Sequence, residues 1–442
     1  MCKDSLSSTR RSFLLTSVAL GTTAMLKTPA SGVAQENTAI RPFSVNVDEA
    51  EIVELRRRIT ATRWPDRETV SDASQGVPLD MIRGLAEYWG TQYDWRRFEA
   101  RLNAFPQFVT GIDGVEIHFI HVRSKHSNAM PLIMTHGWPG SLVEFMRVIA
   151  PLTDPTAYGV SANDAFHLVC PHMPGYGFSG KPITTGWDPR RIASAWVELI
   201  NRLGYTQFVA QGGDWGAGVS DFMALQSPPG LLGIHVNLPA TVPSDIARAL
   251  QCGDPPPGGL AADERSAYDQ LTQLYAKKRA YALMMGTRPQ TLYGLADSPV
   301  ALAAWLLDHG DGYGQPAAAL VSAVQGRTIN GHSAGAITKD DVLDDVTLYW
   351  LTNTGISSGR LYWETHFSLY NAANVSVPAA VSVFPGENYQ APRSWAERAY
   401  QNLIYYNRVA EGGHFAAWEQ PELFSEEIRA GFRPLRNAGA TS

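Results

Sequence analysis

The spacing of apolar residues changes along the chain, and each change predicts a different kind of element. Over residues 45–63, apolar residues recur at helical spacing between Asp48, which can cap the first turn, and Pro65, which stops the helix. A second helical stretch is expected over residues 79–93. The chain before Gly111 therefore predicts helices and not strands.

Beyond Gly111 the pattern becomes that of strands. Apolar positions alternate from Val115 to His121, and short apolar runs then alternate with helical stretches. The expected strands are 132–134, 166–170, 208–211 and 231–238, and the expected helices are 189–203 and 216–226. Such alternation predicts an α/β fold with a mostly parallel central sheet flanked by helices.

Residues 241–373 break this rhythm. They contain a loop rich in proline and glycine at 254–259, together with helical stretches rich in Leu, Ala and Tyr. We therefore expect a mostly helical insertion, or lid, between two parts of the sheet.

The rhythm of strands resumes at 377–384 and 403–410, and each of these runs leads into a turn with a titratable residue. In open parallel sheets, ligands bind beyond the carboxyl ends of the strands. The residues that this rule brings to one edge are His136, Asp214, Glu387 and His414.

The N-terminus has the order of parts that is typical of an export signal. Arg10 and Arg11 precede a modest apolar run that ends at Leu26, and small residues then lead to Ala34. We expect a twin-arginine signal peptide over residues 1–34 and a periplasmic or secreted protein. The apolar run is interrupted and falls short of the ~18 to 20 residues that span a bilayer, so no stable membrane anchor is expected.

Charge and cysteine content argue against several other classes of protein. The 442 residues carry a formal charge of -6, and the predicted signal removes four basic residues and one acidic residue, which leaves -6 - 3 = -9. No basic cluster beyond the N-terminus would follow phosphates, so nucleic acid is not an expected partner. The cysteine pattern predicts neither a disulfide framework nor a metal cluster.

The run Gly212-Gly213-Asp214-Trp215-Gly216 stands between an apolar strand and a helix. It has the form of a nucleophile elbow in which Asp214 replaces the usual serine. A serine attacking a saturated carbon would form an ether that water cannot readily remove, whereas a carboxylate forms an ester that water can hydrolyse. The expected substrate is therefore an electrophilic sp3 carbon, as in an epoxide or an alkyl halide.

Two further residues complete a catalytic set. His414, in Glu411-Gly412-Gly413-His414-Phe415, follows the last strand and suits a general base that activates water. Glu387, in Phe384-Pro385-Gly386-Glu387, would orient the imidazole and stabilise its cation, and the neighbouring Glu411 is the alternative acid.

The loop His136-Gly137-Trp138-Pro139-Gly140-Ser141 also follows a strand. Its form is that of a loop that supplies one oxyanion donor, while the residue after the nucleophile supplies the other. We assign these donors to the backbone N–H groups of Trp138 and Trp215.

Taken together, these phrases resemble the microsomal-type epoxide hydrolase family. The resemblance covers nearly everything after the signal and includes an N-terminal segment like that of the family. Its most specific phrases there are Arg63-Trp64-Pro65-Asp66, Tyr93-Asp94-Trp95-Arg96, Leu102-Asn103-Ala104-Phe105-Pro106-Gln107-Phe108 and Ile112-Asp113-Gly114. The resemblance implies an α/β-hydrolase fold, divided into an N-terminal segment (35–110), a first core part (111–240), a helical lid (241–373) and a second core part (374–442).

The resemblance also implies two lid tyrosines that hold and protonate the epoxide oxygen. The matching positions are Tyr281, before Thr287-Arg288-Pro289, and Tyr362, after Ser357-Ser358-Gly359-Arg360. Tyr349 and Tyr370 are nearby competitors for the second position. The implied reaction needs no cofactor and no metal, and its expected partner is a small hydrophobic epoxide.

Two other functions remain open at this point. A haloalkane or haloacid dehalogenase would use the same Asp-His-acid logic, with N–H donors to the departing halide in place of the phenols. A hydrolase fold that binds a hydrophobic ligand without turnover is the second alternative. The sequence leaves the choice between a monomer and a homo-oligomer open.

Overall fold

The computed structural model describes residues 38–308, 318–329 and 331–438, so the predicted signal over 1–34 lies outside the described residues. The first helix predicted from the sequence, α1 (Glu49–Thr60), begins as expected, because the Asp48 carboxylate caps it by accepting the Ala50 N–H at 2.9 Å. It ends three residues before the predicted limit.

A nine-stranded sheet forms the centre of the molecule, in the order β1-β2-β3-β5-β4-β6-β7-β8-β9. Neighbours from β1 to β5 in this order pair antiparallel, and all neighbours from β5 to β9 pair parallel. The bounds are β1 Arg41–Phe43, β2 Gln107–Ile112, β3 Val115–Val122, β4 Met130–Thr135, β5 Phe166–Pro171, β6 Phe208–Gly212, β7 Leu231–Val236, β8 Ala379–Val383 and β9 Leu403–Arg408. The predicted mostly parallel α/β architecture is confirmed.

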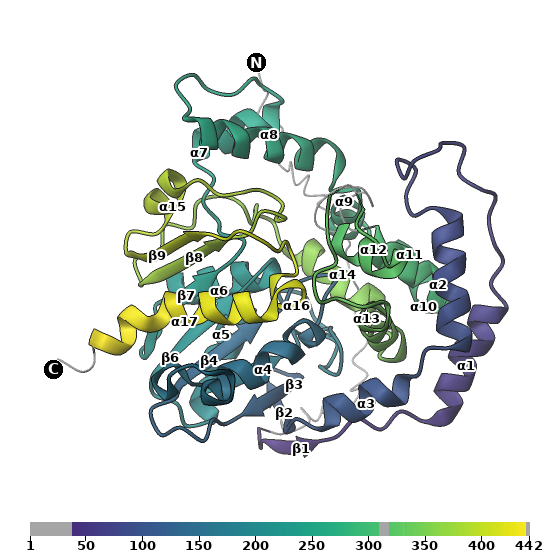
Figure 1. The fold of residues 1–442 in the computed structure, drawn as a ribbon, viewed down its shortest axis with the longest axis horizontal. Helices are drawn as coiled ribbons and strands as arrows, with labels where there is room; N and C mark the ends of the chain where they lie inside the picture. Colours follow the sequence, from purple (N-terminus) through teal and green to yellow (C-terminus); the bar gives the residue numbers. More distant parts are fainter. Residues whose placement is uncertain (1–37, 309–317, 330, 439–442) are drawn as a thin grey trace, which may run out of the picture.

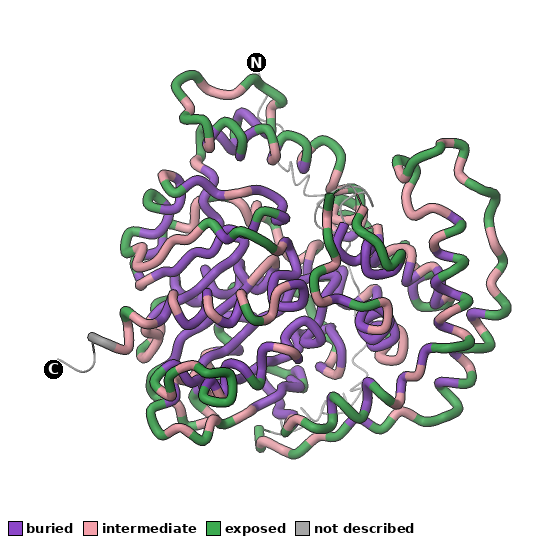
Figure 2. Tube along the Cα trace, viewed as in Figure 1, coloured by how far each residue is buried: buried purple, intermediate pink, exposed green. Residues whose placement is uncertain are grey.

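Helices of the core pack on this sheet in two groups, α5 on α6 and α4 on α17. Their bounds, with those of two shorter helices, are α4 Met146–Thr153, α5 Pro189–Arg202, α6 Trp215–Gln226, α15 Arg393–Ala399, α16 Ala416–Glu419 and α17 Pro421–Ala438. Short 3-10 helices are η1 Leu142–Phe145, η2 Pro155–Tyr158, η3 Ala162–Asp164 and η4 Pro289–Thr291. The parallel strands and the inner faces of these helices form one large buried region, and further buried residues lie in the insertion and in the N-terminal helices (Figure 2).

Between β7 and β8 the chain leaves the sheet and forms a helical insertion. Its helices are α7 Ser244–Cys252, α8 Ala262–Lys277, α9 Ala280–Thr287, α10 Gly294–Asp297, α11 Pro299–Leu307, α12 Ala318–Gln325, α13 Lys339–Leu351 and α14 Gly355–Glu364. The two ends of the insertion lie side by side, because the Val242 N–H donates to the Tyr370 carbonyl at 2.8 Å and the Ala372 N–H donates to the Val242 carbonyl at 3.0 Å. A narrow stem therefore joins the insertion to the sheet.

The N-terminal helices run along the outside of this insertion, away from most of the sheet (Figure 1). They are α1, α2 (Leu79–Thr91) and α3 (Trp95–Asn103), and they contact α11, α12 and α13. Helix α3 and strands β1 and β2 were not predicted from the sequence. Buried side chains of these helices, such as Leu55 and Trp89, continue the apolar core outward.

Candidate active site

Asp214 stands at the sharp turn between β6 and α6. Its backbone has φ 49° and ψ -124°, which is a strained conformation for a residue with a side chain. Glycines flank it for steric reasons: a Cβ on Gly212 would lie 2.0 Å from the Gly216 carbonyl oxygen, and one on Gly216 would lie 1.9 Å from the Thr135 carbonyl oxygen. The predicted elbow therefore has the geometry that exposes a nucleophile at the end of a strand.

The Asp214 carboxylate is held by backbone groups from two segments. The Trp138 N–H donates to Oδ1 at 2.9 Å, and the Trp215 N–H also hydrogen-bonds the carboxylate. Burial raises the pKa of Asp214 above its ordinary value, while the charge of His414 and the two N–H groups act in the opposite direction. The same two donors are in place to stabilise negative charge that develops at this carboxyl group.

His414 lies between Glu387 and Asp214. Its Nδ1 is 2.6 Å from Glu387 Oε1, and its Nε2 is 3.7 Å from Asp214 Oδ2. Burial alone would lower the pKa of His414, but the charge of Glu387, the hydrogen bond to it and the charges of Asp214 and Glu144 raise this pKa to about 9. The resting site is thus built to hold an imidazolium between carboxylates.

Two tyrosines of the insertion face this carboxylate from α9 and α14. The ring of Tyr281 stacks on Trp138 with centroids 4.9 Å apart, and the ring of Tyr362 meets Trp215 edge-on at 4.7 Å. Burial, followed by the nearby charge of Asp214, raises the pKa of Tyr281, and burial together with the charges of Tyr281 and Asp214 raises that of Tyr362. Both phenols are therefore protonated hydrogen-bond donors at neutral pH.

The competing residues have other partners. The buried Tyr349 hydroxyl donates to the Gly140 carbonyl at 2.9 Å, and the Tyr370 hydroxyl accepts from Asn388 Nδ2 at 3.2 Å. Glu411 is exposed and accepts from Gln420 at 3.5 Å. The structure brings together the seven residues selected from the sequence, whose roles in turnover stay predictions: Asp214, His414, Glu387, Trp138, Trp215, Tyr281 and Tyr362.

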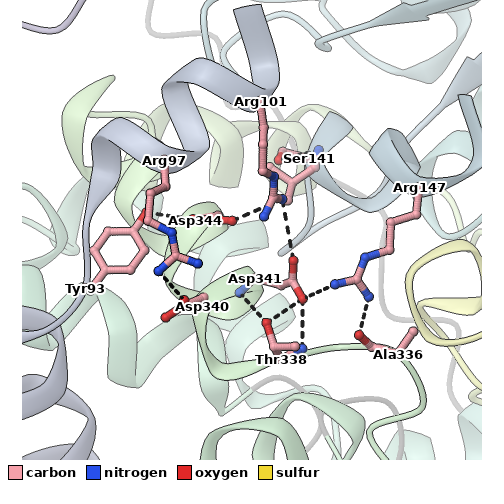
Figure 3. A network of polar contacts seen from close by, with 11 residues as sticks. Tyr93, Arg97, Arg101, Ser141, Arg147, Ala336, Thr338, Asp340, Asp341 and Asp344 are labelled. Atoms are coloured by element: carbon pink, nitrogen blue, oxygen red, sulfur yellow. Dashed lines mark hydrogen bonds and ion pairs between the residues drawn. The ribbon is translucent and has the colours of Figure 1, made fainter. Parts of the chain in front are cut away.

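A polar network fixes the loop that carries Trp138 to the insertion and to the N-terminal segment (Figure 3). From α4, Arg147 Nη2 lies 2.6 Å from Asp341 Oδ2 at the start of α13, and from α3, Arg101 Nη2 lies 3.6 Å from Asp341 Oδ1. In the loop itself, Ser141 Oγ donates to Asp345 Oδ1 at 2.6 Å. Segments far apart in sequence therefore hold the loop that carries Trp138 in one position.

Glu144 was not predicted from the sequence, and the fold brings it to the same site from η1. It is 8% exposed and lines a small cavity with Asp214 and His414. A single acid within the apolar stretch from Leu142 to Met146 was the available signal.

Within residues 38–308, 318–329 and 331–438, no group of three or more His, Cys, Asp or Glu side chains is arranged to hold a metal ion.

Among the helices of the same ranges, none combines the length and the apolar character needed to span a membrane.

Comparison with known proteins assigns the family. Residues 40–145 match the model described as epoxide hydrolase N terminus, and residues 130–297 match the alpha/beta hydrolase fold. A protein of Stigmatella aurantiaca whose name includes the words epoxide hydrolase is 49% identical over 399 residues, covering 90% of this chain and 86% of that protein. Epoxide hydrolase 1 of Sus scrofa is 34% identical over 416 residues, covering 90% and 89% of the two chains.

Solved structures give the same result. The juvenile hormone epoxide hydrolase of the silkworm Bombyx mori aligns with a TM-score of 0.80 at 29% identity, covering 93% of this chain and 98% of that one. The epoxide hydrolase of Aspergillus niger aligns with a TM-score of 0.75 at 28% identity, covering 91% and 98%. The extent of these matches shows that this chain belongs to the epoxide hydrolase family.

Proposed function

We propose that this protein converts epoxides to vicinal diols through an ester formed on Asp214. The observation that carries the proposal is the presence of a partly buried carboxylate and two phenols around one aromatic site, where the rings of Tyr281 and Tyr362 are 5.9 Å apart and both pack on Trp138. A carboxylate attacks a saturated carbon, and phenols stabilise the oxygen that leaves that carbon. Together these groups supply what epoxide opening needs.

In the first step, an Asp214 carboxylate oxygen bonds to one epoxide carbon while the bond from that carbon to the epoxide oxygen breaks. A proton passes from Tyr281 or Tyr362 to this oxygen, which leaves a β-hydroxy ester and a phenolate. The raised pKa values of both phenols keep the proton available at neutral pH. The charge of His414 favours the ionised form of Asp214 that this step requires.

In the second step, water attacks the carbonyl carbon of the ester. Before this attack, the His414 imidazolium gives its proton to the phenolate left by the first step. The neutral imidazole then accepts the proton of the water, and Glu387, at 2.6 Å, stabilises the imidazolium that results. The N–H groups of Trp138 and Trp215 stabilise the negative charge on the tetrahedral intermediate. The ester bond then breaks and the diol leaves.

The aromatic walls favour a small hydrophobic epoxide as the substrate, because Trp138, Trp215 and the two tyrosine rings surround the carboxylate with apolar surface. The site and the family relationship support the alternative function, dehalogenation, less well than epoxide hydrolysis. Dehalogenation needs donors to a halide but no phenols, and the family relationship favours epoxides.

Diol formation by residues 35–442, measured on terminal and disubstituted epoxides, tests the proposal. We expect turnover by the parent protein and none by Asp214→Ala. A panel of haloalkanes serves as the control for the dehalogenase alternative. Full diol formation by Asp214→Asn, without prior deamidation to Asp, would contradict the mechanism, and halide release without diol formation would replace it.

We also propose that residues 1–34 direct export through the twin-arginine route. The order of Arg10-Arg11, apolar run and small residues supports this. Fusion of residues 1–34 to a reporter in a bacterial host should place the reporter in the periplasm, and changing both arginines to lysine should retain it in the cytoplasm. Export of the lysine variant would contradict the proposal.

A further inference from the structure

A small cavity lies next to the carboxylate of Asp214, on the side of His414. It measures about 10 Å³, which is close to the smallest space that holds one water molecule. Its polar lining includes Asp214, His414, Glu144, Gln211 and Asn237. The side-chain carbonyl oxygen of Gln211 is buried there and has no hydrogen-bond partner among the described residues. The cavity thus has the size and the polarity of a site for a single bound water.

Glu144 is a buried acid whose position is set by the neighbouring loop. Its Oε1 lies so close to Gly140 that a Cβ on that residue would be 1.6 Å away, so only glycine leaves room for the carboxyl group. Backbone hydrogen bonding from Gly137 also reaches this carboxyl group. The loop from His136 to Ser141 therefore carries an oxyanion donor and also encloses the Glu144 side chain.

Burying the Glu144 carboxyl group at this place costs free energy that a residue with only a packing role would not need to spend. Burial raises the pKa of Glu144 well above the ordinary value, the charge of His414 lowers it, and the charges of Asp345 and Asp214 raise it further. A buried carboxyl group is stabilised best by a cation or by several hydrogen bonds, and an apolar residue would avoid the cost. Strongly perturbed acids beside reactive groups are concentrated at functional sites.

We propose that Glu144 is a further catalytic residue, which holds the hydrolytic water in this cavity between its own carboxyl group, the His414 imidazole and the ester carbon of Asp214. The inference rests on the proposed function. A Glu144 oxygen accepts a hydrogen bond from one hydrogen of the water, while His414 Nε2 faces the other. The water oxygen is then directed at the carbonyl carbon.

The step balances without a further reactant. The water gives a proton to His414 Nε2 and its oxygen bonds to the carbonyl carbon of the ester. The bond from this carbon to the alkyl oxygen breaks, and the imidazolium returns the proton to that oxygen as the diol leaves. The carboxylic acid of Asp214 then ionises and gives its proton to His414, which restores the imidazolium of the resting enzyme. Glu144 transfers no proton.

Ester formation itself strengthens the role of Glu144. The negative charge of Asp214 is one cause of the raised pKa of Glu144, and this charge disappears when Asp214 is esterified. Glu144 ionises more readily in the ester than in the resting enzyme, so it becomes a better acceptor for the water at the step that uses it.

A purely structural role makes a different prediction. If Glu144 only held the loop, its loss would displace the Trp138 N–H, which bonds Asp214 Oδ1 at 2.9 Å before any substrate reacts. Ester formation and ester hydrolysis would then both become slower. A role in holding water affects only the hydrolysis.

The test is a rapid-quench measurement of both steps in Glu144→Gln, with the ester detected by mass on the peptide that contains Asp214. We expect ester formation to stay near the parent rate and ester breakdown to become slower by about 100-fold, because the water loses its orientation. The ester should therefore accumulate. The matched control is Glu427→Gln, a buried acid bonded to Ser382 and outside the site, which should leave both rates unchanged.

Equal slowing of both steps, or breakdown at the parent rate, would overturn the role of Glu144. If Glu144→Gln does not fold, Glu144→Asp is the second variant, because its shorter side chain keeps the carboxyl group but withdraws it from the water. The rates of ester formation and ester breakdown are then compared in the same way. Failure of the proposed function looks different: no ester would form on Asp214 in the parent protein or in His414→Gln, whatever residue occupies position 144.

Discussion

A methyl group added at Gly137 should slow catalysis strongly without disturbing the fold far from the site. A Cβ at this position would lie 2.4 Å from Asp214 Cβ and 2.6 Å from Asp214 Oδ1. Ordinary van der Waals contact begins near 3.4 Å, so the loop and the nucleophile have to separate by about 1.0 Å. The conflict cannot be relieved by rotating a flexible side chain, because the closest atom is the Cβ of Asp214.

The separation acts on the first chemical step. A displacement of this size costs about 100-fold in rate when it misplaces a reacting group, and a weakened Trp138 N–H bond to Asp214 adds to the loss. Single-turnover measurements with Gly137→Ala in excess over substrate should therefore show ester formation slower by about 100-fold or more.

Gly84→Ala is the matched control. It lies in α2, and an added Cβ meets nothing within 4 Å. It should leave activity unchanged and stabilise the protein by up to about 1 kcal/mol, because alanine is the better helix former. Ester formation by Gly137→Ala within about threefold of the parent rate would refute the steric reasoning.

Three other predictions follow from the site and its supports. Tyr281→Phe and Tyr362→Phe should each slow epoxide opening by roughly 100- to 1000-fold in rapid-quench assays, while hydrolysis of an ester already formed keeps its rate; opening at the parent rate would remove the phenols from the mechanism. Asp341→Asn should lower the free energy of unfolding in urea by about 1.5–3 kcal/mol, because it discharges a buried partner of a charged hydrogen bond. The more exposed Asp340→Asn should cost less than about 1 kcal/mol, and equal losses would contradict this account. The folded-state pKa of His414, about 9, exceeds the ordinary 6.5, so its pairing stabilises the fold fully below pH 6.5 and this contribution is lost as pH rises through about 9. Urea unfolding across this range should show the loss in the parent and not in His414→Gln, and an identical pH dependence of the two proteins would disprove it.

Local sequence patterns were sufficient to predict the central sheet and the sharp turn at Asp214. Asp214, Glu387 and His414 each follow an apolar run that ends at the same edge of a parallel sheet, so their convergence follows from general geometry. The tyrosines are different: with 17 tyrosines in the chain, Tyr281 and Tyr362 were selected only by resemblance to a family.

The features that the sequence did not predict are those that depend on contacts between distant parts of the chain. Strand β1 has three residues and exists because it pairs with β2, more than sixty positions away, so its sequence carries no periodic signal. The ion pair between Arg101 and Asp341 likewise joins two helices that only the complete fold brings together. Glu144 stands alone among apolar neighbours, but this local pattern does not show that the acid would lie beside Asp214 and His414.

The most direct test of the mechanism is a single turnover in water enriched in 18O, with the enzyme in excess over the epoxide. If the reaction proceeds through an ester on Asp214, water attacks the carbonyl carbon of that ester. The label should then appear in the carboxyl group of Asp214, and the diol should carry none. A labelled diol with an unlabelled Asp214 would show that water attacks the epoxide directly, and would contradict the account.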